Sequence, residues 1–123
     1  MVGQCFFYDT PPNGEHLFVI LADSLTSEGF ICVNITEKHD ESDATCELFQ
    51  GEHPNLTKPV SVVGYGFARE LPLRLIQRLI ARQSLPSMKP DILKRIQNAA
   101  LCDESRMKKG FQEAIQAQLD SDL

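Results

Sequence analysis

The spacing of the hydrophobic residues changes at Gly66. Before this glycine, short apolar runs separated by turn residues are typical of β-strands, and after it apolar residues recur every three to four positions, as in amphipathic helices. Strands in one half and helices in the other predict an α+β fold rather than a parallel α/β fold. A chain of 123 residues is about the size of one domain with a single core.

Five runs before Gly66 have the composition of strands. They cover residues 2–8, 16–22, 29–36, 45–48 and 60–65. In the third run, Asn34 and Thr36 fall on the face opposite Ile35, because side chains alternate along a strand. Close spacing and short turns predict a small antiparallel five-stranded barrel or a strongly coiled sheet.

Helical segments follow, each with an apolar stripe. Pro72 suits the first position of one helix, Pro90 begins a second, and Asp103 is a suitable N-cap for a third. We therefore expect a barrel over residues 1–70 and a C-terminal extension of two to three helices over residues 71–123. The extension is expected to pack on the barrel, so that the whole chain forms a single domain.

The composition is that of an ordinary folded domain, with 42% hydrophobic and 24% charged residues. No apolar run approaches the roughly 18 residues of a membrane span, so no membrane association is expected. The first four residues lack the basic and apolar character of a signal peptide, which predicts a cytoplasmic protein.

The four cysteines have no CxxC spacing, and most lie in apolar runs, which predicts reduced core thiols.

The net charge of −5 is unevenly distributed along the chain. Residues 1–60 carry ten acidic and two basic residues, whereas residues 61–123 carry ten basic and seven acidic residues. In the basic half, Arg74, Arg78 and Arg82 recur every four residues along the first expected helix. Such a stripe can bind RNA or an acidic partner, and it is also typical of a solvated helix face.

Polar residues stand at the ends of several apolar runs. His16 opens the second run, and its imidazole can transfer a proton near neutral pH or, in a structural role, bond a loop carbonyl. Asn34 and Thr36 end the third run on a shared face. Together they can hold a phosphate oxygen that develops charge, although threonine also commonly caps turns.

His53 precedes Pro54 in a short loop that is rigid enough to point a side chain in one direction. If His53 faced His16, the two imidazoles with Thr36 and Tyr65 could cleave a phosphodiester without a metal. Alternatively, the imidazole satisfies backbone groups of its own loop. No histidine pair has the spacing of metal ligands and no cofactor motif is present, so neither a metal nor a cofactor is expected.

The order of these features is distinctive. The features are an opening strand after Gly3, a proline-containing loop, the apolar segment Leu17-Phe18-Val19-Ile20-Leu21, a strand ending in Asn34-Ile35-Thr36, and Ser61-Val62-Val63 before Arg69-Glu70-Leu71. In this order they resemble the MazF/PemK family of toxin endoribonucleases, over about residues 3–71. The resemblance implies an SH3-like barrel, a homodimer, an antitoxin protein as partner and single-stranded RNA as substrate.

The resemblance also suggests roles for single residues. Thr36 matches the catalytic threonine of the family, whereas His16-Leu17 stands where the family has a catalytic arginine followed by proline. A histidine can replace the arginine in proton transfer but not as a permanent positive charge. The expected catalytic residues are His16, Thr36 and His53, and the expected substrate-binding residues are Asn34, Ser61 and Tyr65.

A second hypothesis is a non-catalytic SH3-like barrel that acts as a protein-binding or dimerisation module. The acidic first half of the chain favours this hypothesis, because a surface that binds nucleic acid is expected to be basic. The polar residues at the strand ends favour RNA cleavage.

Overall fold

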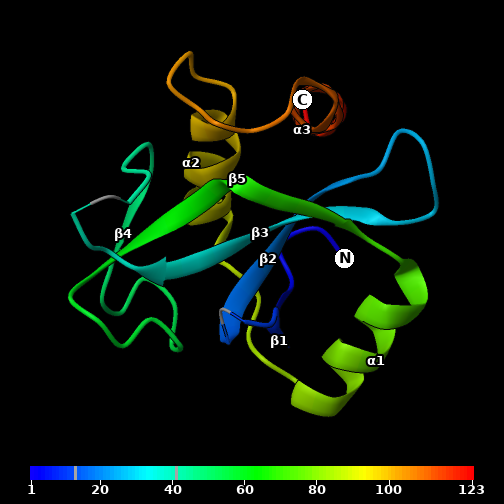
Figure 1. The fold of residues 1–123 in the computed structure, drawn as a ribbon. Helices are drawn as coiled ribbons and strands as arrows, with labels where there is room; N and C mark the ends of the chain where they lie inside the picture. Colours follow the sequence, from blue (N-terminus) through cyan, green and yellow to red (C-terminus); the bar gives the residue numbers. More distant parts are fainter. Residues whose placement is uncertain (13, 41) are drawn as a thin grey trace.

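A computed structural model describes residues 1–12, 14–40 and 42–123. Its five strands form one antiparallel sheet in the order β1-β2-β3-β5-β4 (Figure 1). The strands are β1 (Cys5–Asp9), β2 (Glu15–Asp23), β3 (Phe30–Glu37), β4 (Glu47–Phe49) and β5 (Val60–Leu71). The predicted α+β class and the predicted five-stranded antiparallel sheet are therefore confirmed.

The sheet is open within the described residues, because β1 pairs only with β2 and β4 pairs only with β5. Strand pairing thus does not close the predicted barrel. The segment 84–89 lies between the two ends of the sheet. The N–H of Met88 donates to the carbonyl oxygen of Gly3 at 2.8 Å, and the carbonyl oxygen of Pro86 lies 2.7 Å from Nε2 of His53. This segment therefore links the β1 side of the sheet to the loop between β4 and β5.

β5 is longer than the predicted strand and contains a bulge. Gly64 pairs with Asn34 of β3. The next pair along the ladder joins Arg69 to Cys32, so four residues of β5 bulge out opposite one residue of β3. A bulge bends a strand and increases its twist. Because pairing with β3 resumes at Arg69 after the bulge, β5 continues past Gly66, where the sequence pattern predicted its end.

Three helices are present in the described residues, and they cover both faces of the sheet. They are α1 (Leu73–Gln83), α2 (Pro90–Ala100) and α3 (Lys109–Ser121). α1 packs on one face, and α2 and α3 pack on the other (Figure 1). Pro90 begins α2 as predicted, and Pro72 lies one residue before its predicted position, as the N-cap of α1. The prediction that Asp103 caps α3 is wrong, because residues 101–104 form a turn and α3 begins only at Lys109.

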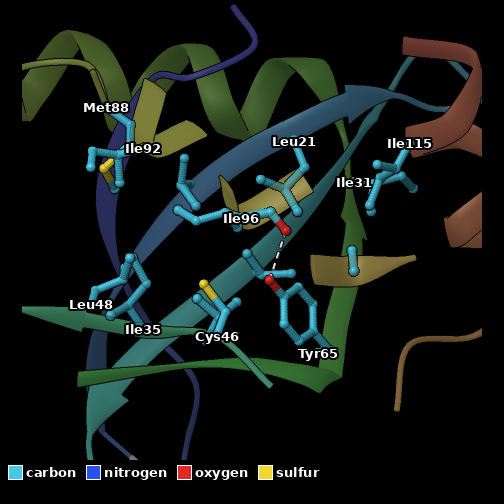
Figure 2. Packing of buried hydrophobic residues seen from close by; sticks show 14 of the residues in the cluster. Leu21, Ile31, Ile35, Cys46, Leu48, Tyr65, Met88, Ile92, Ile96 and Ile115 are labelled. Atoms are coloured by element: carbon cyan, nitrogen blue, oxygen red, sulfur yellow. Dashed lines mark hydrogen bonds between the residues drawn. The ribbon is translucent and has the colours of Figure 1, made fainter. Parts of the chain in front are cut away.

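The hydrophobic core has two parts, one on each face of the sheet. The larger cluster, on the α2/α3 face, includes Leu21, Ile31, Ile35, Leu48, Ile96 and Ile115 (Figure 2). Leu17 belongs to the same cluster. The smaller cluster, on the α1 face, contains Phe6, Phe18, Ile20, Cys32, Leu71 and Ile76. Successive residues of a strand face opposite sides of the sheet. If a strand residue belongs to one cluster, the residues just before and after it in the strand therefore lie on the opposite face of the sheet.

The helices also bear on the expectation about membranes. No helix in the part of the chain that the structure describes has the length and apolar character needed to cross a membrane.

Candidate functional site

The strand register brings two of the predicted site residues together at one end of the sheet. Leu17 pairs with Ile35 across β2 and β3, and both belong to the cluster on the α2/α3 face. The residues that adjoin them at the strand ends therefore face the other way. His16 and Thr36 lie on the α1 face, and the antiparallel register, continued by one residue, sets them opposite each other.

Asn34 lies on the same face. It pairs with Phe18, a member of the α1-face cluster, and on its other side with Gly64. A Cβ built on Gly64 would collide with Oδ1 of Asn34, so the amide lies directly over the glycine. We call His16, Asn34 and Thr36 the polar strip, because they line one end of the α1 face of β2 and β3.

Two residues of the α1 face adjoin the polar strip, and sequence reasoning did not identify either as a site residue. Phe67 lies in the bulge of β5 and is 65% exposed, and its Cδ2 is 3.5 Å from the position of a Cβ on Gly64. Arg69 pairs with Cys32 of the α1-face cluster and is exposed. Both were missed because the strand was expected to end before Gly66. Phe67 and Arg69 were therefore not expected to lie in the sheet.

His53 is buried and does not reach the polar strip. The residue is 1% exposed, and its Nε2 lies 2.7 Å from the carbonyl oxygen of Pro86, which can only accept a hydrogen bond. Its Nδ1 accepts a hydrogen bond from the N–H of Asn55 at 3.0 Å. These two contacts require a neutral imidazole with its hydrogen on Nε2. His53 therefore satisfies backbone groups, and the predicted meeting of His53 with His16 does not form.

Ser61 and Tyr65, which were predicted to bind substrate, are buried on the α2/α3 face. Tyr65 is 0% exposed, and its hydroxyl donates to the carbonyl oxygen of Ile96 at 2.7 Å (Figure 2). Burial raises the pKa of Tyr65 far above its usual value. Ser61 is 4% exposed and pairs with Leu48 of the larger cluster. Strand alternation thus separates both side chains from the polar strip.

The arginines of α1 add positive charge to the α1 side of the molecule. Arg74, Arg78 and Arg82 are all exposed. The ion pairs among the described residues are Lys38–Glu47, Lys94–Asp122 and Arg95–Glu52. Neither Arg69 nor an arginine of α1 takes part in one of these pairs, so their charges are not neutralised by a described carboxylate.

Two hollows on the surface of the described residues lie away from the polar strip. A hollow of about 500 Å³ lies beside Glu37 and His39, and another of about 460 Å³ lies beside Asp43 and Cys102. No residue of the polar strip lines either hollow. No group of three or more histidine, cysteine, aspartate or glutamate side chains in residues 1–12, 14–40 and 42–123 is placed to hold a metal ion.

The chain matches no protein-family model, no curated protein and no solved structure. The function proposed below therefore depends on the geometry of the polar strip and on the sequence pattern.

Proposed function

We propose that this protein is a MazF/PemK-like toxin-type endoribonuclease that cleaves single-stranded RNA at the polar strip without a metal ion. The observation that carries the proposal is the register of β2 and β3, which, continued by one residue beyond the pair Leu17–Ile35, sets His16 opposite Thr36 on one face of the sheet. The proposal includes an SH3-like barrel, an antitoxin protein as partner, a homodimer and a cytoplasmic site of action. The barrel type is supported by segment 84–89, which spans the gap between β1 and the β4–β5 loop.

In the proposed reaction, His16 accepts the proton of a ribose 2′-hydroxyl, and the 2′-oxygen attacks the adjacent phosphorus. The bond between phosphorus and the 5′-oxygen of the next nucleotide breaks, and this oxygen takes a proton from water. The products are a 2′,3′-cyclic phosphate and a 5′-hydroxyl. The hydroxyl of Thr36 donates to a phosphate oxygen, and Arg69 supplies positive charge as negative charge develops there. His53, Ser61 and Tyr65 have no role in this reaction.

The test is cleavage of end-labelled single-stranded RNA in the presence of EDTA. His16→Ala and Thr36→Val should each lower the rate by about 100-fold or more, the usual effect of removing a proton-transfer or oxyanion-stabilising group. The free energy of unfolding should change by no more than about 1 kcal/mol, because both residues are partly exposed at strand ends.

Matched controls are His39→Ala and Thr57→Val, which change exposed residues of the same types outside the polar strip. Both controls should cleave RNA at the rate of the unmodified protein. Intact RNA after incubation with the unmodified protein would contradict the proposal. A loss of activity that follows a matching loss of stability would instead give His16 and Thr36 a structural role.

A second candidate function is a non-catalytic module that binds a protein. Two observations favour it: the acidic composition of residues 1–60, and the exposed aromatic side chains of Phe49 and Phe67, which are 49% and 65% exposed. Under this alternative, the unmodified protein neither binds nor cleaves single-stranded RNA. The same cleavage assay therefore separates the two functions.

A further inference from the structure

The side chain of Asn34 contains a buried oxygen without a hydrogen-bond partner among the described residues. Its Oδ1 is shielded from solvent and accepts no hydrogen bond from residues 1–12, 14–40 or 42–123, although the residue as a whole is partly exposed. An unpaired buried acceptor opposes folding, because it has left water without gaining a partner. On the face that carries His16 and Thr36, this acceptor is suited to a ligand that brings an N–H donor.

Gly64 and Phe67 form the surroundings of this oxygen. Because Gly64 has no side chain, the amide of Asn34 lies directly over the backbone of β5. The ring of Phe67 approaches the same point, with Cδ2 3.5 Å from the position of a Cβ on Gly64. Since the ring is exposed and lies in the bulge, it can rotate off the amide without disturbing the core. An exposed aromatic ring beside a polar group is a common arrangement for binding unpaired bases.

We propose that Asn34 and Phe67 form a subsite for one unpaired adenine of the RNA, an inference that rests on the proposed function. Adenine presents a donor, its N6 amino group, beside an acceptor, its N7. The carboxamide of Asn34 matches this edge, because Oδ1 accepts from N6 and Nδ2 donates to N7. The bound base takes the place of the ring over the amide, and the ring of Phe67 stacks on the base.

On the Hoogsteen edge, the other bases do not match the carboxamide of Asn34 as adenine does. Guanine presents two acceptors on the corresponding edge, one of which would face Oδ1 of Asn34. Cytosine and uracil have no N7, so they could form two hydrogen bonds with the carboxamide only through their Watson–Crick edges, and comparison with 7-deazaadenine isolates the contact to N7. The proposed pairing through N6 and N7 is therefore specific to adenine, whose amino group supplies a donor to Oδ1.

Arg69 supplies the charge complementarity that the phosphate of this nucleotide needs. It follows Phe67 by two positions, is exposed on the α1 face and forms no ion pair within the described residues. A guanidinium binds phosphate oxygens through two parallel hydrogen bonds. Because every nucleotide carries a phosphate, Arg69 contributes to affinity and Asn34 to the choice of base.

The experiment measures the binding of fluorescent 2′-O-methyl RNA decamers, which cannot be cleaved because they lack a free 2′-hydroxyl. The unmodified protein should bind the adenine decamer about tenfold more tightly than the uracil decamer. It should also bind the adenine decamer about tenfold more tightly than a decamer in which 7-deazaadenine replaces adenine, because 7-deazaadenine lacks the N7 acceptor.

Variants test each half of the subsite. Asn34→Asp keeps the shape and the acceptor but removes the donor. This variant should therefore bind the adenine and 7-deazaadenine decamers equally. Asn34→Ser is a second variant with the same expected ratio.

Phe67→Ala should weaken binding of every decamer about tenfold, and Phe67→Trp should restore it, because both aromatic rings stack on a base. Phe49→Ala is the matched control, since Phe49 is also exposed, lies in β4, and should not affect binding. Circular dichroism confirms that each variant is folded.

Equal affinity of the unmodified protein for the adenine and 7-deazaadenine decamers would overturn the subsite, as would a preference that survives both changes at Asn34. Cleavage of ordinary RNA is measured separately. Adenine preference without cleavage would support the subsite and reject the endoribonuclease. Cleavage without adenine preference would support the endoribonuclease and reject the subsite. A complete absence of RNA binding would overturn both.

Discussion

At the scale of single residues, the position of the Asn34 amide on the α1 face requires that residue 64 has no side chain. Gly64→Ala places a Cβ where it collides with Oδ1 of Asn34, so the amide must rotate away from β5. We expect a loss of about 1–3 kcal/mol in the free energy of unfolding, as for other overpacked sites. RNA binding should weaken in parallel. Urea denaturation and fluorescence anisotropy measure the two effects.

Gly66→Ala is the control for this change. A Cβ on Gly66 would lie 3.4 Å from Cβ of Arg106, an ordinary contact with an exposed residue. Its free energy of unfolding should stay within about 0.5–1 kcal/mol of the unmodified protein. Equal effects of the two glycine substitutions would show that the contact with Asn34 is not what requires a glycine.

The cysteines differ in burial and therefore in reactivity. All four are free thiols, as predicted, and only Cys102 is partly exposed. Burial raises the pKa of Cys5 to about 12 and raises those of Cys32 and Cys46 as well. Because the thiolate is the reactive form, one thiol per chain should react rapidly with Ellman's reagent at pH 8, and Cys102→Ser should abolish this phase. A rapid phase of more than one thiol would show that the core opens easily.

At the scale of secondary-structure elements, side chains cover both edges of the open sheet. On β1, the amide of Gln83 accepts from the N–H of Phe7 and donates to the carbonyl oxygen of Phe7 at 2.8 Å. On β4, Glu52 accepts from the N–H of Phe49 at 2.8 Å and also forms an ion pair with Arg95. Uncovered edge strands pair with other chains. These contacts therefore protect a sheet that strand pairing leaves open.

Gln83→Ala should expose the edge of β1. The N–H and carbonyl of Phe7 would lose their partners, so we expect a loss of about 1–3 kcal/mol in the free energy of unfolding and self-association as the concentration rises. Size-exclusion chromatography with light scattering measures the mass. Gln77→Ala, an exposed change on the same helix, is the control. A monomer at every concentration would show that the edge of β1 is protected by something else.

The ion pair beside β4 predicts a pH dependence. The hydrogen bond from Arg95 lowers the pKa of Glu52 in the folded protein. An unfolded glutamate titrates near pH 4.3, so the stabilisation is complete above this pH and is lost as the pH falls through the lower folded pKa. Urea denaturation between pH 6 and pH 3 should therefore show a smaller loss of stability for Glu52→Gln than for the unmodified protein. Parallel curves would indicate that the ion pair does not contribute.

At the scale of the whole molecule, the helices and the segment between α1 and α2 surround the sheet. α1 covers one face, segment 84–89 passes the β1 side, and α2 and α3 cover the other face. β2 and β3 contribute residues to both hydrophobic clusters. Because the two clusters share these strands, we expect the chain to unfold as one cooperative unit.

Ile76→Ala and Ile115→Ala test this coupling. Each residue is 0% exposed, one in the smaller cluster and one in the larger. Each variant should lose about 2–5 kcal/mol in the free energy of unfolding and still unfold in one transition. Scanning calorimetry and the fluorescence of Tyr8 and Tyr65 follow the two clusters together. Two transitions, or a variant that shifts the signal of one tyrosine only, would show two separate units.

The boundaries of most elements could be predicted from the sequence, because hydrophobic periodicity and proline positions act locally. Pro90 begins α2 as predicted, and Pro72 lies one residue before its predicted position, as the N-cap of α1. Asn34 and Thr36 share a strand face as predicted. The end of β5 was missed because its continuation past Gly66 depends on pairing with β3, a strand about thirty residues earlier.

The candidate site was predictable only in part. Adjacent residues of a strand must face opposite sides, so the sequence alone determined that Asn34 and Thr36 project together, away from Ile35. Tertiary structure decided which face is open, that His53 turns inward to the carbonyl of Pro86, and that Phe67 reaches the polar strip. These outcomes depend on hydrogen bonds and packing between segments far apart in the chain, and no local pattern of residues encodes the partner of such a contact.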